Sequence, residues 1–347
     1  MTKEYDFPYK WKLKDAIFTK DKGKVFSCFA CGGGSTMGYK LAGFDVIGHN
    51  DIDNKMVEVY KANHNPKYSF LESITTFAKR KDLPEELYKL DILDGSPPCS
   101  SFSMAGNREK DWGKEKIFRE GQELQVLDTL FFDFIDLAKE LQPKVIIAEN
   151  VKGLLLGNAR EYVRNIYKAF DNAGYYCQHF LLDASKMGVP QRRERVFFIS
   201  FRKDLAEPFL YQQDMFTFNP KLELNFKGEK LTLNKINVEL GDDLKGFAIQ
   251  DWIRMKNGKP KKYLQSVMVD INEVHPTIVA GYKSKASPMP NWIPKWLSKS
   301  DLCKIGSYPQ DYNFVKIKES YLIGMSVPPV MTAQIASQVY DQWLNKL

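Results

Sequence analysis

The sequence predicts an α/β fold built on a doubly wound, mostly parallel sheet, with a smaller irregular domain attached. Up to about residue 200, apolar runs of strand length alternate with stretches of helical period, which is typical of βαβ units. Beyond residue 200 this alternation is lost, and the chain stays polar and irregular until about residue 275. We therefore expect a large domain over residues 1–200, a smaller one over 201–312, and a final segment, 313–347, that returns to the large domain.

The composition is that of a folded, basic protein. Its 347 residues are 44% hydrophobic and 13% aromatic, and the net charge of +7 is compatible with a polyanionic partner such as nucleic acid. No apolar run approaches the roughly 20 residues of a membrane span, and the lysine-rich N-terminus lacks the apolar core of a signal peptide. We therefore expect no membrane association and an intracellular, cytoplasmic location.

The cysteines indicate reduced thiols and no metal site. Five cysteines, an odd number in a chain of this length, do not suit a disulfide framework. Cys28 and Cys31 have C-x-x-C spacing, but no second pair and no histidine at zinc spacing accompany them. Both are expected to pack in or beside a strand end.

A glycine cluster marks the first strand-turn-helix unit. The apolar run from residue 24 to 30 predicts a buried strand, Gly32 to Gly34 a turn, and the stretch through Leu41 a helix. The next apolar run ends at Asp51, eighteen residues after Gly33, close to the roughly 20 that separate a glycine loop from a ribose-binding acid in dinucleotide-type folds. A tight turn and a helix cap would explain the same residues.

The stretch around Cys99 is the strongest local signal. An apolar run at residues 90–93 stops at a glycine and at the pair Pro97 and Pro98, which restrict the backbone and present Cys99 on a stiff loop. Apolar residues at helical period then predict an amphipathic helix over residues 122–141. A β-branched run at residues 145–148 predicts a strand buried on both faces that ends at Glu149.

Ligands of open α/β sheets bind outside the carboxyl ends of the strands. The strand ends that carry Gly33, Asp51, Cys99 and Glu149 should therefore converge on one crevice. Two further strands are predicted over residues 175–182 and 195–200 and could pair with each other.

Between these two strands lies Pro190-Gln191-Arg192-Arg193-Glu194-Arg195. In an extended chain Arg193 and Arg195 point to the same side, which suits an anion. A solvated charged edge is the alternative. The region 201–275 adds a basic stretch, and an amphipathic helix over 330–343 closes the chain.

The order of these signals resembles the cytosine-C5 DNA methyltransferase family over nearly the whole chain from Val25. The matching stretches are Phe29 to Gly38, Pro97-Pro98-Cys99 with Phe102-Ser103, Glu149-Asn150-Val151, the Q-x-R-x-R pattern of Gln191, Arg193 and Arg195, Pro309-Gln310-Asp311-Tyr312, and Gly324 to Pro329. A glycine loop alone fits many Rossmann-like proteins. A Pro-Cys loop and an Asn-flanked Glu in this order point to little else.

The resemblance implies a Rossmann-like methyltransferase domain that transfers a methyl group from S-adenosylmethionine to C5 of cytosine, leaving S-adenosylhomocysteine, with no metal. Cys99 would attack C6 of the base, Glu149 would act at N3, and Arg193 and Arg195 would hold the base and its phosphate and favour the thiolate. The implied cofactor residues are Phe29, Gly32, Gly33, Gly34, Asp51, Ile52, Pro98, Leu130, Ser326 and Val327.

The implied substrate is double-stranded DNA, from which the target cytosine must be flipped out. Residues 201–312 would then form a target-recognition domain, a cognate restriction endonuclease is a possible partner, and the protein is expected to be a monomer. Two alternatives stay open: a tRNA cytosine-C5 methyltransferase, and a catalytically silent DNA-binding regulator of the same fold. A dinucleotide-binding oxidoreductase would leave the Pro-Pro-Cys loop and the arginines unexplained.

Five positions depart from the family pattern, and none of them carries the chemistry. The family usually has Gly, Asp, Gln, Arg and Asn, respectively, at the positions of Cys31, Ser73, Ser100, His275 and Met325. At Ser100 we expect a smaller contact with DNA than the family's amide side chain makes.

Overall fold

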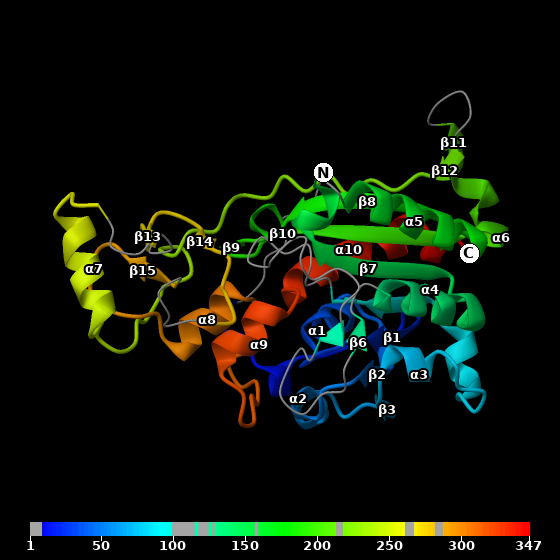
Figure 1. Ribbon diagram of the computed structural model, residues 1–347, viewed down its shortest axis with the longest axis horizontal. Helices are drawn as coiled ribbons and strands as arrows, with labels where there is room; N and C mark the ends of the chain where they lie inside the picture. The colour runs from blue at the N-terminus through cyan, green and yellow to red at the C-terminus, as the bar shows by residue number, and fades with distance from the viewer. Residues whose placement is uncertain are drawn as a thin grey trace.

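The computed structural model describes residues 9–98, 115–116, 125–126, 129–156, 159–212, 218–260, 267–281 and 287–347. A seven-stranded sheet in the order β3-β2-β1-β4-β7-β10-β8 forms its centre (Figure 1). All neighbouring pairs are parallel except those of β10, which runs antiparallel to both β7 and β8. The predicted doubly wound, mostly parallel α/β fold is confirmed.

Six of the seven sheet strands follow predicted apolar runs, whereas the strand at residues 68–71 and the short helix at residues 74–77 were not predicted. The strands of the sheet are β1 (Lys24–Cys28), β2 (Asp45–Asp51), β3 (Tyr68–Leu71), β4 (Ile92–Gly95), β7 (Val145–Val151), β8 (Tyr175–Asp183) and β10 (Glu194–Arg202). The helices beside it are α1 (Gly34–Leu41), α2 (Asn54–His64), α3 (Ile74–Phe77), α4 (Leu130–Leu141), α5 (Ala159–Asn172) and α10 (Pro329–Gln342).

Alternating side chains of the central strands enter two separate cores, one on each face of the sheet. On β7, Val145 and Ile147 pack with α1, α2 and α10, whereas Ile146 and Ala148 pack with α3, α4 and α5. A strand covered on both faces must be apolar at every position, because successive side chains point to opposite sides. This explains the continuous apolar runs from which the strands were predicted.

Helix α4 begins later than the sequence predicts. The apolar period suggests a helix over residues 122–141, but α4 begins at Leu130, and Gln125–Val126 form strand β6, paired antiparallel with β5 (Glu115–Lys116). A short apolar stretch fits a helix and a strand equally well, so the pairing with β5 decides between them. The prediction was wrong for this first part.

The region beyond residue 200 holds short elements. They are α6 (Lys203–Ala206), β11 (Leu210–Gln212), β12 (Phe218–Pro220), α7 (Phe247–Lys256), β13 (Val267–Val269), β14 (His275–Pro276), β15 (Pro288–Pro290), α8 (Lys299–Ile305) and α9 (Glu319–Met325), with β9 (Gln191–Arg192) just before β10. Helix α7 was not predicted, and only Ala248 and Asp251 of its residues are buried. It lies with β13 and β15 at one end of the molecule, away from the sheet (Figure 1).

The C-terminal helix packs directly against the first helix of the sheet. A Cβ atom at Gly38 of α1 would overlap the carbonyl oxygen of Pro329 and lie 2.5 Å from Cβ of Thr332 and 3.0 Å from the nitrogen of Ala333, all on α10. Only glycine permits an approach this close between two backbones. No helix in the described part of the chain is long and apolar enough to span a membrane.

We predict that Gly38→Ala destabilises the protein. Alanine favours a helix, but its methyl group would force α1 and α10 apart, and such overpacking costs about 1–3 kcal/mol. The free energy of unfolding, measured by chemical denaturation, should fall by this amount. The exposed Lys55→Ala on α2 is the control and should change stability little. An unchanged or raised stability of Gly38→Ala would contradict the close packing of α1 on α10.

Candidate active site

Four parallel strands end at the same edge of the sheet. In β1, β2, β4 and β7 the pairing brings Cys28 opposite both Asn50 and Gly95, and Gly95 opposite Ala148. The segments that follow these strands therefore meet at one edge, where the sequence predicts the crevice.

An ion pair joins two of the predicted catalytic side chains at this edge. Nε of Arg195 on β10 lies 2.9 Å from Oε1 of Glu149 on β7, and the two side chains are 16% and 13% exposed. The strands bring them together because Arg195 pairs with Val151 and Phe197 with Glu149 in the antiparallel ladder. An ion pair this far from solvent is screened less than one on the surface.

The residue after Glu149 holds the loop that leads to Cys99. Nδ2 of the buried Asn150 donates to the carbonyl oxygen of Pro97 at 3.2 Å, and its Oδ1 accepts from the amide of Val151. Pro98 follows as a half-buried residue, and Cys99 itself lies outside the described residues. The Pro-Cys loop is therefore attached to the strand end that carries Glu149.

Arg193 is almost completely buried, with 2% exposure. Its Nη2 donates to the carbonyl oxygen of Gly324 at 3.1 Å, while Nε and Nη1 have no hydrogen-bond partner among the described residues. Burial and the neighbouring Arg195 lower the pKa of Arg193 to about 9. Two donors buried without a partner are costly, so they suit an oxygen-bearing ligand at this position.

Gln191 joins the Q-x-R-x-R stretch to a distant part of the chain. Its Oε1 accepts from the amide of Ile278 at 2.9 Å, and β9 pairs in parallel with β14, so that His275 lies opposite Gln191. His275 is fully buried, and burial lowers its pKa to about 4. A neutral histidine therefore stands where the family usually has arginine.

The glycine loop lies between β1 and α1 and has an unusual backbone. Gly33 has φ of 89°, and the non-glycine residues Phe29 and Cys31 also lie in the left-handed region, at 51° and 48°. The backbone amide of Cys31 donates to Oδ2 of Asp51 at 2.7 Å. The backbone amide of Asp53 donates to Oδ1 of the same carboxylate at 2.8 Å. Burial raises the pKa of Asp51 to about 6. The Asp51 carboxylate thus fixes the loop as well as the end of β2.

The three glycines of the loop make room for other parts of the protein. A Cβ atom on Gly32 would overlap Leu322 of α9, and one on Gly34 would lie 2.7 Å from Cβ of Ser326 and from the carbonyl oxygen of Val327. The C-terminal segment therefore lies against the loop. The other predicted cofactor residues are Phe29 and Ile52, both half-buried, and Leu130, which is 2% exposed at the start of α4.

The sequence reasoning missed a buried acid at the same strand end. Asp94 on β4 accepts hydrogen bonds from the hydroxyl groups of Ser27, Ser35 and Tyr39, at 2.6, 2.9 and 3.0 Å. Burial raises its pKa to about 6. It therefore joins β4 to β1 and α1. The sequence did contain a signal for this role: Asp94 is an acidic residue at the end of an apolar run, directly before the Pro-Cys loop.

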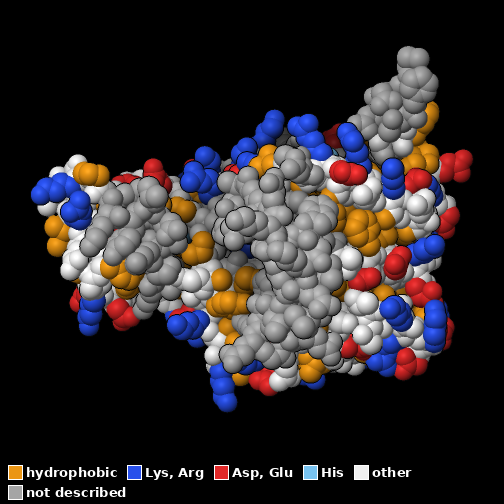
Figure 2. All heavy atoms as spheres, in the orientation of Figure 1, with side chains coloured by type: hydrophobic (Ala, Val, Ile, Leu, Met, Phe, Trp, Pro, Cys, Tyr) orange, Lys and Arg blue, Asp and Glu red, His pale blue; other side chains and the backbone are white. Residues whose placement is uncertain are grey.

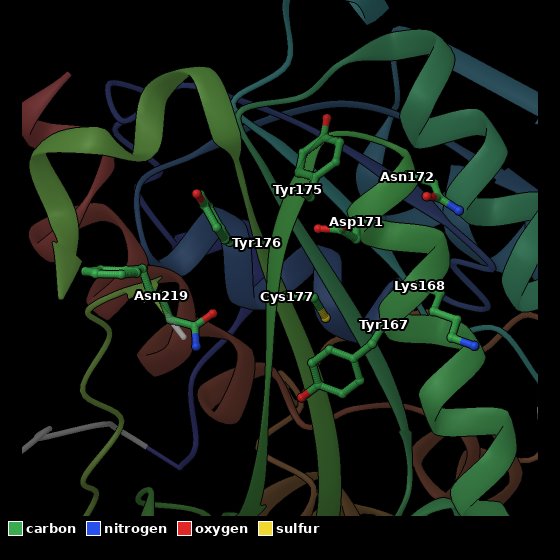
Figure 3. Close-up of a pocket in the computed structure, with 9 residues that line it drawn as sticks. Tyr167, Lys168, Asp171, Asn172, Tyr175, Tyr176, Cys177 and Asn219 are labelled. Atoms are coloured by element: carbon green, nitrogen blue, oxygen red, sulfur yellow. The ribbon is translucent and has the colours of Figure 1, made fainter. Parts of the chain in front are cut away.

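A separate hollow lies at the other end of the strands, away from their carboxyl ends. Figure 3 shows its lining residues. The hollow has a volume of about 620 Å³ and lies between the end of α5 and the start of β8, lined by Tyr167, Tyr175, Tyr176 and Phe218 among others. Strand β8 runs in the direction of β7, so its start lies far from Glu149. This hollow is therefore not part of the active site. In the described residues no group of His, Cys, Asp or Glu is placed to hold a metal.

Basic side chains occur over much of the visible surface, including one long edge of the molecule (Figure 2). Figure 2 shows Lys and Arg along the upper edge of the face in view and at the end formed by α7. Arg254 and Lys256 on α7 and Lys259 after it are exposed. The remaining two lysines of the predicted basic stretch, Lys261 and Lys262, lie outside the described residues.

Comparisons with known proteins agree with this geometry. The chain is similar to the Type II methyltransferase M.NgoPII of Neisseria gonorrhoeae, with 36% identity over 63% of this chain and 57% of that protein. It is also similar to M1.HphI of Haemophilus parahaemolyticus, with 26% identity over 92% of this chain and 87% of that protein. The alignments with the first relatives span about half of those proteins' length.

A solved structure has the same fold. It is described as a putative DNA modification methyltransferase encoded within a prophage of E. coli, and it matches with a TM-score of 0.65 and 20% identity over 92% of this chain and 99% of its own. The model of the family described as C-5 cytosine-specific DNA methylase matches residues 23–341. The chain therefore belongs to the C-5 cytosine-specific DNA methylase family.

Proposed function

We propose that this protein is an S-adenosylmethionine-dependent DNA methyltransferase that methylates C5 of a flipped-out cytosine in duplex DNA, as part of DNA modification or a restriction-modification system. Family membership over residues 23–341 supports the reaction class. The Type II names of the relatives support the restriction-modification setting. A cognate endonuclease, a cytoplasmic location and a monomeric state remain predictions.

The observation that carries the proposal is the attachment of the Pro-Cys loop to the strand that bears the acid. Asn150 bonds the carbonyl of Pro97, two residues before Cys99, and Glu149 is bound to Arg195 beside it. A nucleophile that follows this loop in the sequence, together with an acid and a cation at the strand end, can attack a ring, hold a proton and bind an oxygen.

The residues of the glycine loop fit the cofactor that the family uses. Asp51 is an acceptor at the end of β2 that would bind ribose hydroxyl groups, and it already accepts from two backbone amides. Phe29 and Ile52 are half-buried and offer apolar surface for an adenine ring. When bound, S-adenosylmethionine supplies a methyl group on a sulfonium, which is a strong electrophile. Ser326 and Val327 close the far side of the loop.

The first chemical task of the chain is to make C5 of cytosine nucleophilic. In the proposed mechanism the Cys99 thiolate adds to C6, forming an S–C6 bond and moving electron density to C5. Glu149 holds a proton at N3 of the base, which stabilises the charge that develops there. After transfer, loss of the C5 proton to a base and breaking of the S–C6 bond release the product and the thiolate.

The arginines position the base. Arg195 is bonded to Glu149, so its guanidinium also lies next to the base edge that Glu149 would face, and O2 is the acceptor there. Arg193, whose Nε and Nη1 have no partner in the described residues, would complete its hydrogen bonds on the same ligand or its phosphate. In both roles the guanidinium group of the arginine donates hydrogen bonds to an oxygen atom and keeps its proton.

The target base must leave the duplex before it can reach Cys99, and this costs a few kcal/mol that DNA contacts offset. We assign these contacts to residues 201–312, the proposed target-recognition domain. The exposed Arg254, Lys256 and Lys259 support this assignment, because phosphates attract basic side chains. The last part of this range, including Tyr308 and Tyr312, packs towards the glycine loop.

The experiment that tests the proposal is bisulfite or nanopore sequencing of DNA from cells that express the protein. We expect 5-methylcytosine at one short recurring sequence. The same purified protein is then offered DNA and tRNA with labelled cofactor. Transfer to tRNA alone would contradict the DNA substrate, and transfer to neither would favour the silent regulator.

We predict that Cys99→Ser abolishes methyl transfer, lowering the rate at least about 1,000-fold, since a hydroxyl is a far weaker nucleophile than a thiolate. Glu149→Gln should lower it about 100-fold by removing the proton at N3. Both variants should still bind S-adenosylhomocysteine in calorimetry. Cys177→Ser on β8 is the matched control and should keep full activity. Activity retained by Cys99→Ser would refute the mechanism.

We also predict that cofactor affinity falls at acid pH. The pKa of Asp51 is raised to about 6, so the carboxylate is ionised at pH 7.5 and becomes protonated as the pH falls below this value. A protonated Asp51 loses acceptor capacity for the ribose. The affinity for S-adenosylhomocysteine, measured by calorimetry, should fall several-fold between pH 7.5 and 5.5.

The variant Asp51→Asn is the control for this pH dependence. It should bind S-adenosylhomocysteine more weakly than the wild-type protein at pH 7.5, and its affinity should fall less when the pH is lowered. Any fall that remains is assigned to Asp94, whose pKa is also raised to about 6. A wild-type affinity independent of pH over this range would contradict the role of Asp51.

A further inference from the structure

A row of aromatic rings lies beneath the glycine loop and joins distant parts of the chain. His49 on β2 stacks on Tyr60 of α2 with ring centroids 3.7 Å apart, and Tyr60 lies 4.8 Å from His64 at the end of the same helix. His64 in turn lies 5.9 Å from Tyr312, which follows α8. All four side chains are buried. The row therefore connects the second strand to the C-terminal third of the protein.

Hydrogen bonds run along the same row and end on the loop. Nζ of Lys40 lies 3.4 Å from Nδ1 of His64 and donates to the His64 carbonyl oxygen at 3.2 Å. Nε2 of His64 lies 3.1 Å from the hydroxyl of Tyr312. The Tyr312 hydroxyl donates to the carbonyl oxygen of Gly32. We call these four groups, Lys40, His64, Tyr312 and the Gly32 carbonyl, the loop bridge.

The chemistry of its members fixes the direction of each bond in the loop bridge. An ammonium group can only donate, so Nδ1 of His64 accepts and Nε2 carries the hydrogen. Tyr312 then accepts from Nε2 and donates to Gly32. Burial and the charge of Lys40 keep the pKa of His64 well below its ordinary value, so the ring stays neutral. Burial lowers the pKa of Lys40 to about 8, which leaves it mostly charged at neutral pH.

The loop is held at two consecutive residues. Asp51 accepts from the amide of Cys31, and the loop bridge binds the carbonyl of Gly32. The next residue, Gly33, has φ of 89°, and a Cβ atom there would overlap the His64 ring. His64 thus both fills the space beneath Gly33 and orients the group that holds Gly32.

We propose that His64 and Tyr312 are positioning residues that hold Gly32 and Gly33 in the shape that binds S-adenosylmethionine, so that the C-terminal third of the chain sets cofactor affinity through the loop. The inference rests on the proposed function. The bonds of the loop bridge end on the backbone of the loop, one residue after the amide that Asp51 holds. Its loss should therefore weaken cofactor binding and leave the chemical step at saturating cofactor unchanged.

The test is the variant Tyr312→Phe, which removes one hydroxyl and keeps the ring packing. Calorimetry with S-adenosylhomocysteine should show a dissociation constant about tenfold weaker, the effect of losing one buried hydrogen bond. The rate of methyl transfer at saturating cofactor should stay within about twofold of wild type.

The matched control is Tyr340→Phe. This ring on α10 packs edge-on against Phe44 at 6.0 Å and belongs to the same core, but it is not part of the loop bridge. Tyr340→Phe also removes one hydroxyl group, but it should leave both the dissociation constant for S-adenosylhomocysteine and the rate of methyl transfer unchanged. An equal loss of affinity in the control would show a general effect of the core and would overturn the inference.

A second variant guards against misfolding of the first. His64→Phe keeps a ring between Tyr60 and Tyr312 and removes both nitrogen atoms. It should also weaken binding, and the double variant should weaken it by less than the product of the two single effects, because both act through one chain of hydrogen bonds. Fully multiplicative effects would show that the two residues act independently and would contradict the loop bridge.

Two further results, both for Tyr312→Phe, would overturn the inference. Tyr312→Phe could bind S-adenosylhomocysteine as tightly as wild type, or it could lose transfer rate at saturating cofactor with unchanged affinity. Failure of the proposed function looks different. A wild-type protein that binds no S-adenosylhomocysteine refutes both, whereas one that binds it but methylates neither DNA nor tRNA refutes only the proposed function, and the affinities of the variants still decide the role of the loop bridge.

Discussion

The parallel pairing of β4 with β7 is the constraint on which the active site depends. Because Gly95 lies opposite Ala148, the chain that leaves β4 passes the end of β7, where Asn150 can bind the carbonyl of Pro97. The same strand end presents Glu149 to Arg195 of β10. Two prolines restrict the loop and one amide attaches it, so the approach to Cys99 starts from a fixed point. A catalytic group held by packing and hydrogen bonds loses little entropy when it reacts.

The proposed cofactor side of the site is completed by His64 and by residues almost three hundred positions further along the chain. The glycines at 32–34 leave space that Leu322, Ser326, Val327 and His64 fill. Asp51 and Tyr312 then hold the backbone of the loop at two consecutive residues, Cys31 and Gly32. The positive φ values of Phe29 and Cys31 are strained for side-chain-bearing residues and persist because the surrounding contacts determine them. The loop is therefore a product of the tertiary structure, although its sequence looks like a local motif.

Much of the fold could be predicted from the sequence, and the limits have physical reasons. The central strands are covered on both faces, so their apolar runs are easily found, whereas the edge strand β3 is only partly buried and was missed. The start of α4 was placed too early because pairing of β6 with β5 decides that segment. Helix α7, which buries little, was also missed. At the site, the strand ends with Asp51 and Glu149 were predicted from order and spacing. Asp94, His64 and Tyr312 were not assigned roles, since their hydrogen bonds join elements that no local pattern connects.

The central claim is that Cys99 forms a bond to C6 of a cytosine during methyl transfer, and trapping that bond tests it most directly. Duplex DNA in which 5-fluorocytosine replaces cytosine cannot lose a proton from C5, so the covalent adduct should persist after transfer. The account predicts a denaturant-stable complex that forms only with S-adenosylmethionine, and mass spectrometry that finds the base on the peptide containing Cys99. Methyl transfer to ordinary DNA by a protein that forms no such complex, or a complex through another cysteine, would contradict it.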